Sequence, residues 1–331
     1  MLIEEKEYKE IEKTIVDLKE EKILEFFQFI YDRQLLHYNR NTLKLPKEQW
    51  TDNPILKKYK FCNSYRQLDK GTLYINKFIN ENNLKDDFPR LFLNVLTYRF
   101  FNIYEFFKRF SNKPLPLNFN FDEYSKIYDD DSFSWFSSAY LIGPASNKNK
   151  KYPIDSLKKH QVIMYILSQI SNEDFLIEFC EKIKNTTPRN VLTRLTSLDN
   201  VGVFLAGQVL DDLCHNVPDA IGFTNNDWLI VGPGAKRGLE IMFGDVSKKM
   251  QVFWCMFLHR NQETYMNRIQ PKVKAGKTLR WDDIKYTTEE NPTGELTLME
   301  GIQHSLCEYR KSKNLFRMEN ETDFRCKRRY Y

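Results

Sequence analysis

The sequence contains little cysteine, glycine or proline, and each shortage excludes a class of protein. Six Cys among 331 residues, with no CxxC pair, are too few and too scattered for a disulfide scaffold. Twelve Gly and 12 Pro exclude a collagen-like chain and a Pro/Gly-rich disordered chain. We therefore expect reduced thiols in a reducing compartment.

A long apolar run is also missing. No stretch of about 18 apolar residues occurs, and the most apolar segment, residues 88–110, is interrupted by charges, namely Arg90, Arg99, Glu105, Lys108 and Arg109. The N-terminus, MLIEEKEYKE, lacks the basic residues and following apolar stretch of a secretory signal. We expect a soluble, intracellular protein of the cytoplasm, nucleoid or nucleus, with no membrane partner.

What is present is typical of a globular protein. Hydrophobic residues make up 41%, charged residues 29% and aromatic residues 15% of the chain. The length suits one large domain or two coupled ones. We expect an N-terminal acidic helix and linker (1–45), a helical domain (50–312) with a weaker boundary near 144–153, and a basic tail (313–331).

The charge is unevenly distributed although the net charge is only +5. Residues 1–25 carry nine acids and five bases, whereas residues 236–280 carry ten bases and three acids. Residues 309–331 carry eight bases and three acids. Basic clusters suit a phosphate backbone, because each neutralised phosphate releases counterions. A solvated basic surface explains the same pattern, so charge alone does not decide.

Apolar residues recur near the helical period along most of the chain, which predicts a mainly α protein. The expected helices are residues 4–38, 55–82, 88–110, 154–171, 173–184, 187–197, 204–213, 235–243, 247–266 and 296–313. Alternating patterns are scarce, and residues 227–231 are the best candidate strand. Residues 270–295 are expected to be irregular.

The segment LDNVGVFLAGQVL (198–210) is typical of a helix-hairpin-helix. An apolar helix end is followed by a tight turn at Asn200 and Gly202, and then by a second helix. The turn and the start of that helix offer backbone N–H groups to a DNA phosphate, and Asn tolerates the left-handed conformation. A simple corner between two helices explains the same residues.

The segment IVGPGAKRGL (230–239) predicts an anion site. Gly232 and Gly234 allow backbone amides to approach an anion, and Lys236 and Arg237 lie in the first turns of the helix that follows. Two bases there would oppose the helix dipole unless an anion is bound. An ordinary loop-to-helix junction is the alternative.

Two further segments carry candidate chemistry. In FCNSYRQLDKGTLY (61–74), Asn63, Arg66 and Lys70 are expected on one helical face near Asp69, and Arg and Asn suit phosphates and base edges. In EGIQHSLCEYRKSK (300–313), Glu308 or His304 is a candidate general base, and Cys307 a nucleophile or a packing residue. Solvated or amphipathic helix faces would account for both.

Two apparent matches are rejected. PKVKAGKT (271–278) ends like a nucleotide-binding P-loop, but Pro271 replaces its first Gly and no apolar strand precedes it. The Cys and His pairs, such as Cys255 with His259, lack the spacing of a zinc site. We expect no metal and no cofactor.

Together, FCNSYRQLD, LDNVGVFLAGQVLDDL, VGPGAKRGL and HSLCEYRK resemble, in order and spacing, a known family over roughly residues 50–312. This is the helical domain associated with 5-hydroxymethyldeoxyuridine DNA kinases. It belongs with the α-glutamyl/putrescinyl thymine pyrophosphorylases, which are amino-acid:DNA transferases of phage and related genomes.

The resemblance implies a DNA-glycosylase-like helix-hairpin-helix fold that acts on a flipped, modified thymine in double-stranded DNA. In that chemistry an amine or amino acid displaces pyrophosphate from 5-pyrophosphoryloxymethyl-uracil. A separate DNA kinase would supply the phosphorylation, since no kinase domain is recognised in this sequence. Glycosylases of this fold that form a Schiff base carry a Lys where this chain has Phe204, so lyase chemistry is not expected.

The resemblance also implies roles for individual residues. Gly232, Gly234, Lys236 and Arg237 would hold the leaving pyrophosphate. Asp227, Glu308 or Asp69 would accept the amine proton, and Asn63 and Arg66 would read the base or hold a phosphate. From the turn and the basic clusters themselves, we expect DNA phosphates against Asn200, Gly202, Lys272, Lys274 and Lys277.

Two alternatives stay open. One is a non-catalytic DNA-binding module that acts with a hydroxymethyluracil DNA kinase. The other is a monofunctional glycosylase for a modified base, with Asp227 stabilising an oxocarbenium-like sugar.

Overall fold

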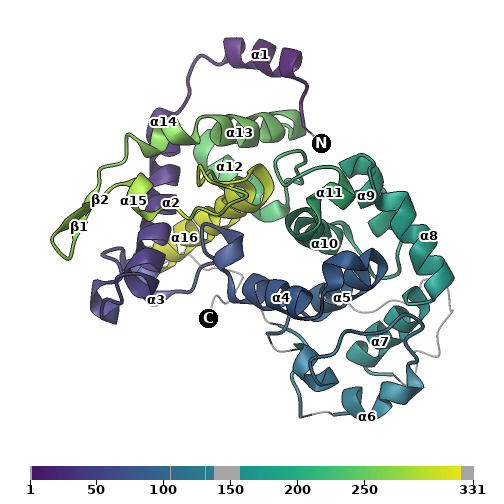
Figure 1. The fold of residues 1–331 in the computed structure, drawn as a ribbon. Coiled ribbons are helices and arrows are strands. Elements are labelled where there is room, and N and C mark those ends of the chain that lie inside the picture. The colour runs from purple at the N-terminus through teal and green to yellow at the C-terminus, as the bar shows by residue number, and fades with distance from the viewer. Residues whose placement is uncertain (1, 105, 131, 138–156, 322–331) are drawn as a thin grey trace. The chain divides into compact units, whose positions relative to one another are not determined.

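A computed structural model describes residues 2–104, 106–130, 132–137 and 157–321. Helices account for nearly all of the regular structure in these ranges, with one two-stranded sheet (Figure 1). The predicted mainly α class is therefore confirmed. The chain divides into two compact units: unit 1 comprises residues 1–69 and 225–331, and unit 2 comprises residues 70–224.

Unit 1 combines the two ends of the chain. Its elements are α1 (Glu5–Thr14), α2 (Glu20–Asn41), η1 (Lys47–Gln49), α3 (Pro54–Lys58), η2 (Arg66–Leu68), α12 (Pro233–Phe243), α13 (Lys248–Arg260), α14 (Gln262–Met266), β1 (Lys272–Lys274), β2 (Lys277–Leu279), α15 (Trp281–Ile284), the π-helix η7 (Leu298–Gln303) and α16 (His304–Asn320).

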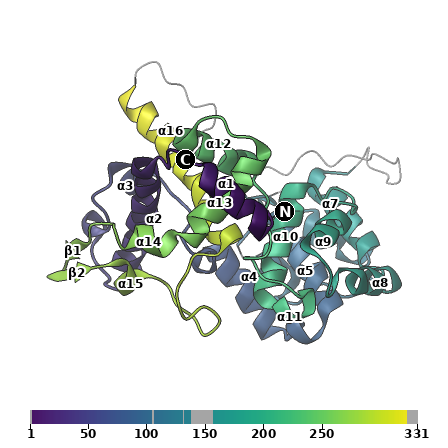
Figure 2. The same ribbon diagram turned by 90° about the horizontal axis from the view of Figure 1, so that it is seen from above.

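The core of unit 1 forms where α2, α12 and α16 lie side by side (Figures 1 and 2). Phe26 of α2 meets Tyr309 of α16 edge to face, and Phe27 stacks on Tyr265 of α14. The backbone of α16 lies against α12 at Gly238, where an added Cβ would lie 2.4 Å from the carbonyl oxygen of Leu306. The glycine thus sets the distance between these two helices.

The expected single helix over residues 4–38 is wrong, because two helices form there. Lys19 adopts a left-handed conformation, and its N–H donates to the carboxylate of Asp17, which ends the periodic run between α1 and α2. α1 then docks on α13: Tyr8 packs on Phe253, and Arg260 lies over the Tyr8 ring and pairs with Glu5 at 2.7 Å.

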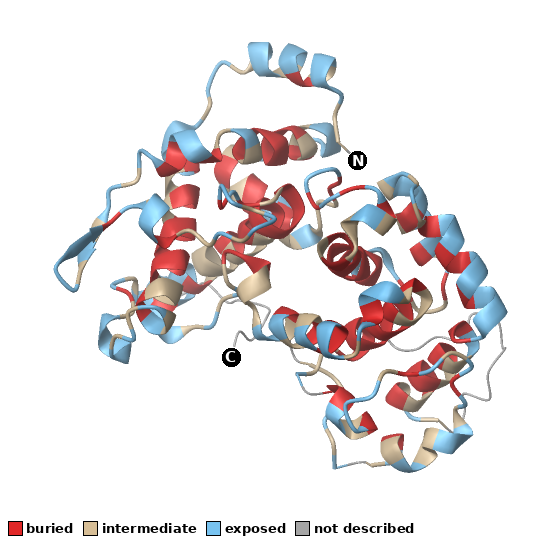
Figure 3. Cartoon of the chain, viewed as in Figure 1, coloured by how far each residue is buried: buried red, intermediate tan, exposed pale blue. Residues whose placement is uncertain are grey.

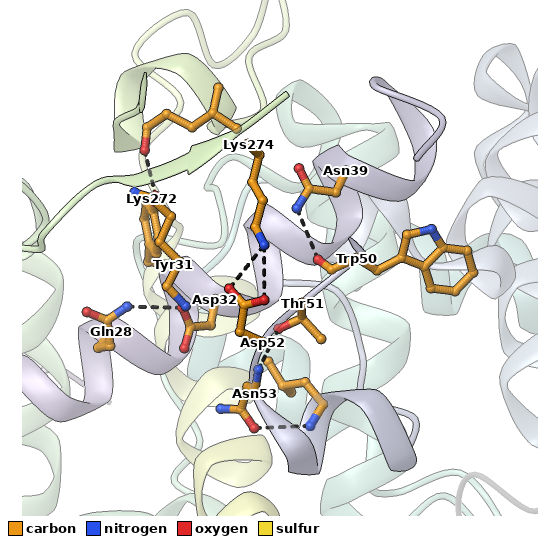
Figure 4. A network of polar contacts seen from close by, with 12 residues as sticks. Gln28, Tyr31, Asp32, Asn39, Trp50, Thr51, Asp52, Asn53, Lys272 and Lys274 are labelled. Atoms are coloured by element: carbon orange, nitrogen blue, oxygen red, sulfur yellow. Dashed lines mark hydrogen bonds and ion pairs between the residues drawn. The ribbon is translucent and has the colours of Figure 1, made fainter. Parts of the chain in front are cut away.

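Residues 270–295 are not wholly irregular, since β1 and β2 form an antiparallel hairpin. Ala275 and Gly276 both have positive φ, as a two-residue hairpin turn requires. Figure 4 shows how the hairpin is anchored on the N-terminal part of unit 1: Lys274 pairs with Asp52 at 3.0 Å, and the N–H of Lys272 donates to the hydroxyl of Tyr31.

Unit 2 is a continuous stretch of chain. It consists of α4 (Lys70–Glu81), η3 (Leu84–Asp86), α5 (Phe88–Phe101), η4 (Phe106–Phe110), η5 (Asp122–Tyr124), α6 (Ser125–Tyr128), α7 (Lys159–Ile170), α8 (Glu173–Ile183), α9 (Pro188–Leu195), α10 (Val203–Asn216) and α11 (Pro218–Ile221).

Helices α5 and α10 form the centre of unit 2. Both are buried along most of their length, as the colouring of Figure 3 shows. The guanidinium of Arg99 makes two contacts of 2.5 Å with the carboxylate of Asp212, and both side chains are almost fully buried. A charged pair thus joins the two central helices inside the core of unit 2.

Other predicted elements are interrupted. The helix expected at 55–82 breaks between α3 and α4, the one at 88–110 ends at Phe101, and the one at 247–266 is divided between α13 and α14. The strand expected at 227–231 is absent. This segment is irregular after the turn at 225–226, and the buried Trp228 ring donates a hydrogen bond to the side chain of Asn225.

Among the helices of the described residues, none has the length and apolar character to cross a bilayer. The boundary expected near 144–153, the start of the 154–171 helix and the end of the basic tail lie outside the described residues. α16 continues to Asn320, past residue 313 where we expected the tail to begin.

Candidate functional site

A buried arginine holds residues 62–69 against α2. Arg33 donates to the carbonyl oxygens of Cys62 and Asn63 and, at 3.2 Å, to the hydroxyl of Ser305 at the start of α16. In a continuous helix these two carbonyl oxygens would accept backbone N–H groups of the next turn. Because they accept from Arg33 instead, the helix expected at 55–82 breaks here. One side chain therefore joins three segments far apart in the sequence.

Asn63 organises the same segment internally. Its amide donates to the carbonyl oxygen of Leu68 and to the carboxylate of Asp69 at 2.8 and 2.9 Å, and its amide oxygen lies 3.0 Å from Nδ1 of His37. We had expected Asn63, Arg66 and Lys70 to share one helical face, and this expectation is wrong because residues 62–65 are not helical. Direct reading of a base by Asn63 stays a prediction and would require these bonds to break.

Arg66 lies beside the π-helix. Its side chain is 8% exposed and lies 3.8 Å from the carboxylate of Glu300, which is 4% exposed. Six residues, Leu298–Gln303, form the π-helix, and such turns are frequent at functional sites. The N–H groups of Leu298 and Met299 donate to Asn226 and Asn225, so the turn that carries Asp227 adjoins this segment.

The start of α12 adjoins the start of α16. An added Cβ on Gly234 would lie 2.3 Å from Sγ of Cys307, and one on Gly232 would lie 3.6 Å from the amide nitrogen of Gln303. At the residue after Cys307, the carboxylate of Glu308 accepts the N–H of Cys62 at 3.2 Å. The segments 61–69, 231–239 and 304–311 thus meet in unit 1, and we call Arg33, Asn63, Arg66, Asp69, Glu300 and Glu308 the polar cluster.

Several titratable groups in or beside the polar cluster have shifted pKa values. Burial raises the pKa of Asp69 despite the hydrogen bonds from Asn63. The negative charge of Glu308 raises the pKa of the Cys62 thiol, which therefore stays protonated. Burial lowers the pKa of His37 and of Arg33, and Glu308 opposes the shift at Arg33. A carboxyl group with a raised pKa is suited to proton transfer near neutral pH.

Helix α12 carries two exposed cations. Lys236 and Arg237 are exposed, and Lys236 lies 3.4 Å from Glu240 one turn along the helix. Gly232 caps the helix without a side-chain hydrogen bond. Such an exposed ion pair is weak, so an anion can compete with Glu240 for Lys236.

The remaining candidates lie elsewhere. Asp227 is exposed on its turn in unit 1. Asn200, with φ of +61°, and Gly202 form the α9–α10 turn of unit 2. Two lysines of the basic hairpin form ion pairs with acids from distant segments, Lys272 with Asp32 at 2.8 Å and Lys274 with Asp52. Lys277 is exposed. DNA binding by the hairpin stays a prediction.

Sequence reasoning missed Arg33 and Glu300. The available signal was a charge within an otherwise apolar stretch, as in FIYDRQLL for Arg33 and LMEGI for Glu300. Within the described residues, no group of three or more His, Cys, Asp or Glu is placed to hold a metal ion.

The family model for the 5-hmdU DNA kinase helical domain matches residues 20–320. The chain belongs to this family. The match includes the polar cluster, the α9–α10 turn and the basic hairpin, and it excludes α1. The resemblance inferred from the four sequence segments is therefore confirmed, whereas the helix-hairpin-helix geometry remains a prediction.

A family relative agrees with this assignment. The chain is 31% identical over 274 residues to a 5-hmdU DNA kinase of Bacillus phage SP10. The alignment covers 78% of this chain and 42% of the kinase, so the chain spans less than half of that relative's length. No solved structure matches the chain.

Proposed function

We propose that this helical-domain protein acts on 5-hydroxymethyluracil-derived bases in DNA and displaces pyrophosphate from the 5-methylene group with an amine or amino acid. The observation that supports the proposal is the meeting of segments 61–69, 231–239 and 304–311 at the polar cluster, inside the region that matches the family. The name of the phage relative supports modified thymine in DNA as the substrate class.

The reaction forms one bond and breaks one. The amine nitrogen attacks the 5-methylene carbon, the bond between that carbon and the pyrophosphate oxygen breaks, and pyrophosphate leaves with the electron pair. The proton lost by the amine passes to a carboxylate. We assign this role to Asp69 or Glu308, since burial raises the pKa of Asp69 and the Cys62 N–H orients Glu308.

Lys236 and Arg237 would stabilise the leaving pyrophosphate. Fixed positive charge and backbone N–H groups at a helix start are the groups that such a leaving group requires. Arg66 would be oriented by Glu300, which acts as a positioning residue. A separate DNA kinase would prepare the substrate, and a flipped base would be needed for the attack.

The test is the intact mass of a short duplex that carries one 5-pyrophosphoryloxymethyl-uracil. It is incubated with the protein and with glycine, glutamate or putrescine. Loss of pyrophosphate with gain of one amine supports the transferase and identifies the amine. Replacing Lys236 and Arg237 together by Gln should slow turnover by roughly 100-fold or more while DNA affinity changes little.

Glu308→Gln and Asp69→Asn identify the base, since loss of a general base costs about 100- to 10,000-fold. Lys182→Gln in unit 2 is the control, because its exposed side chain pairs only with Glu178 on the same helix face among the contacts described. Wild-type turnover in the Lys236/Arg237 double variant would contradict the leaving-group role.

A second candidate function is a non-catalytic module that presents DNA to a separate kinase. It is favoured by the observation that the chain spans 42% of a relative named as a kinase. Binding of the duplex without any change in its mass would support this module. Loss of the base would instead favour the glycosylase with Asp227 as its carboxylate.

A further inference from the structure

A buried glutamine lies at the start of helix α12. Gln303, the last residue of the π-helix η7, is 7% exposed, and its Nε2 atom would lie 3.6 Å from an added Cβ on Gly232, the residue that precedes the first turn of α12. Its Oε1 atom is buried and has no hydrogen-bond partner among the described residues. Leaving a buried acceptor unpaired costs free energy, and nearly all such atoms in proteins are paired. The Gln303 amide is therefore suited to bind a ligand at this point.

The start of α12 is itself suited to an anion. Gly232 caps the helix without a side-chain hydrogen bond. The N–H of Lys236 bonds back to the carbonyl oxygen of Gly232 at 2.9 Å, which is the first backbone bond of the helix. The N–H groups of Gly234 and Ala235 precede this bond and point out of the helix start, where the helix dipole favours negative charge. An anion bound there would lie beside the amide of Gln303.

The backbone of η7 holds Gln303 in a fixed position. The N–H of Ile302 donates to the carbonyl oxygen of Thr297, five residues earlier, at 2.9 Å, which is the bond of a π-helix. The turn packs closely on Leu296, because an added Cβ on Gly301 would lie 2.6 Å from the Cβ of that leucine. A side chain that recognises a ligand requires such a rigid support.

The edge of a uracil ring matches the order of groups at this place. On the ring, the 5-substituent, the O4 acceptor and the N3–H donor follow one another. In the protein, the start of α12 is followed by the Nε2 donor of Gln303, which lies nearer to the added Cβ of Gly232 than Oε1 does, and then by the Oε1 acceptor. We infer that Gln303 reads the flipped base: Nε2 donates to O4, Oε1 accepts from N3–H, and the 5-substituent lies at the start of α12.

This arrangement selects uracil over cytosine. Cytosine presents an amino donor and a ring-nitrogen acceptor at the same two places, so it would fit only with the amide of Gln303 reversed. A negatively charged 5-substituent at the helix start opposes that reversal, because the reversal would turn Oε1 towards the anion. The inference rests on the proposed function for the class of base, and it adds the residue that recognises this base.

The test measures binding of the full chain to two labelled duplexes, and no turnover is required. One duplex carries 5-phosphonomethyluracil and the other 5-phosphonomethylcytosine, each opposite an abasic site, so that no base pair has to open. The phosphonate stands in for the charged leaving group and cannot be displaced. The wild-type protein should prefer the uracil duplex by roughly 5- to 150-fold, the value of one bidentate contact to a base.

Gln303→Met should remove this preference, since it keeps the length of the side chain and loses both hydrogen bonds. Affinity for the uracil duplex should fall to that for the cytosine duplex, which should itself not change. Methylating N3 of the uracil probe removes the donor without altering the protein, and it should cost the wild type a similar factor. Gln251→Met is the matched control in unit 1, because Gln251 is 6% exposed and its Nε2 donates to the carbonyl oxygen of Val246 at 3.0 Å. It should keep the preference.

The outcomes distinguish this inference from the proposed function. Equal affinity of the wild type for the two duplexes, or a preference that survives in Gln303→Met, would overturn the role of Gln303 even if the pyrophosphorylated duplex is still converted. A preference that disappears in Gln303→Met, in a protein that leaves the mass of the pyrophosphorylated duplex unchanged, would support Gln303 as the reader of the base and contradict the transferase.

Discussion

The two units use buried charge in different ways. In unit 1, buried Arg33 and Arg66 contact segments from both ends of the chain and adjoin less buried groups such as Asp69 and Glu308. In unit 2, Arg99 and Asp212 are buried against each other between two central helices. Removing charged groups from water costs free energy, so we expect each of these buried charges to serve a structural or functional purpose. We interpret the charge of unit 1 as organising a site and that of unit 2 as fixing helix packing.

Removing the acid of the unit 2 pair should give the largest effect. Asp212→Ala leaves the buried guanidinium of Arg99 without its carboxylate, which should lower the free energy of unfolding by about 3–5 kcal/mol. Urea unfolding measures the loss, and hydrogen exchange should show it first in amides of residues 70–224. Glu300→Ala should cost less stability, because Arg66 and Glu300 are 3.8 Å apart rather than 2.5 Å.

Replacing both partners of the unit 2 pair provides the control. Arg99→Met combined with Asp212→Leu should recover most of the stability, since a well-packed apolar pair can replace a buried ion pair. A loss below about 1 kcal/mol in Asp212→Ala would mean that the pair does not fix the packing of α5 and α10.

The glycines provide a second comparison between the units. Gly238→Ala places a Cβ 2.4 Å from the carbonyl oxygen of Leu306, which should cost about 1–3 kcal/mol as α12 and α16 move apart. Gly202→Ser in unit 2 meets no atom and adds a side chain that can cap α10, so it should be neutral or stabilise by up to about 1 kcal/mol. Thermal unfolding measures both; equal effects would refute the packing argument.

A histidine makes unit 1 sensitive to acid. Burial, and then the charge of Arg260, lower the pKa of His259 from 6.5 to about 4. The folded state therefore binds the proton more weakly than the unfolded state. The stabilisation from the neutral ring is complete above the unfolded pKa and is lost as the pH falls from 6.5 towards 4. At the lower end this shift corresponds to a loss of about 3 kcal/mol.

His259→Gln should flatten the pH dependence of urea unfolding in this window, compared with wild type. His37, whose pKa burial also lowers, acts in the same direction, so His37→Gln should flatten the remaining slope. If His259→Gln leaves the slope unchanged, the ring is not the source of the acid sensitivity.

The sequence predicted most of the helical regions and singled out the segments that contain 61–69, 231–239 and 304–311, because apolar periodicity and motif spacing are local signals. It did not predict the breaks at residues 15–19 and 59–65. The break at 15–19 rests on the left-handed conformation of Lys19 and its local bond to Asp17, which apolar periodicity does not reveal. The break at 59–65 depends on tertiary bonds, such as those from Arg33 to the carbonyl oxygens of Cys62 and Asn63. The ion pairs of the basic hairpin could not be predicted for the same reason, since Asp32 lies 240 residues from its partner Lys272.

The most local expected effect concerns α1, which lies outside the family match and whose one buried residue is Tyr8. Burial of one such ring contributes about 1.5–3 kcal/mol. Tyr8→Ala should therefore speed hydrogen exchange of residues 5–14 by roughly 10- to 150-fold. Exchange in α2, α12 and α16 should not change, and Val16→Ala, at a fully exposed position, is the control. If instead those core helices lose protection with α1, the helix is part of the cooperative core of unit 1, and the site cannot be treated as independent of residues before the family match.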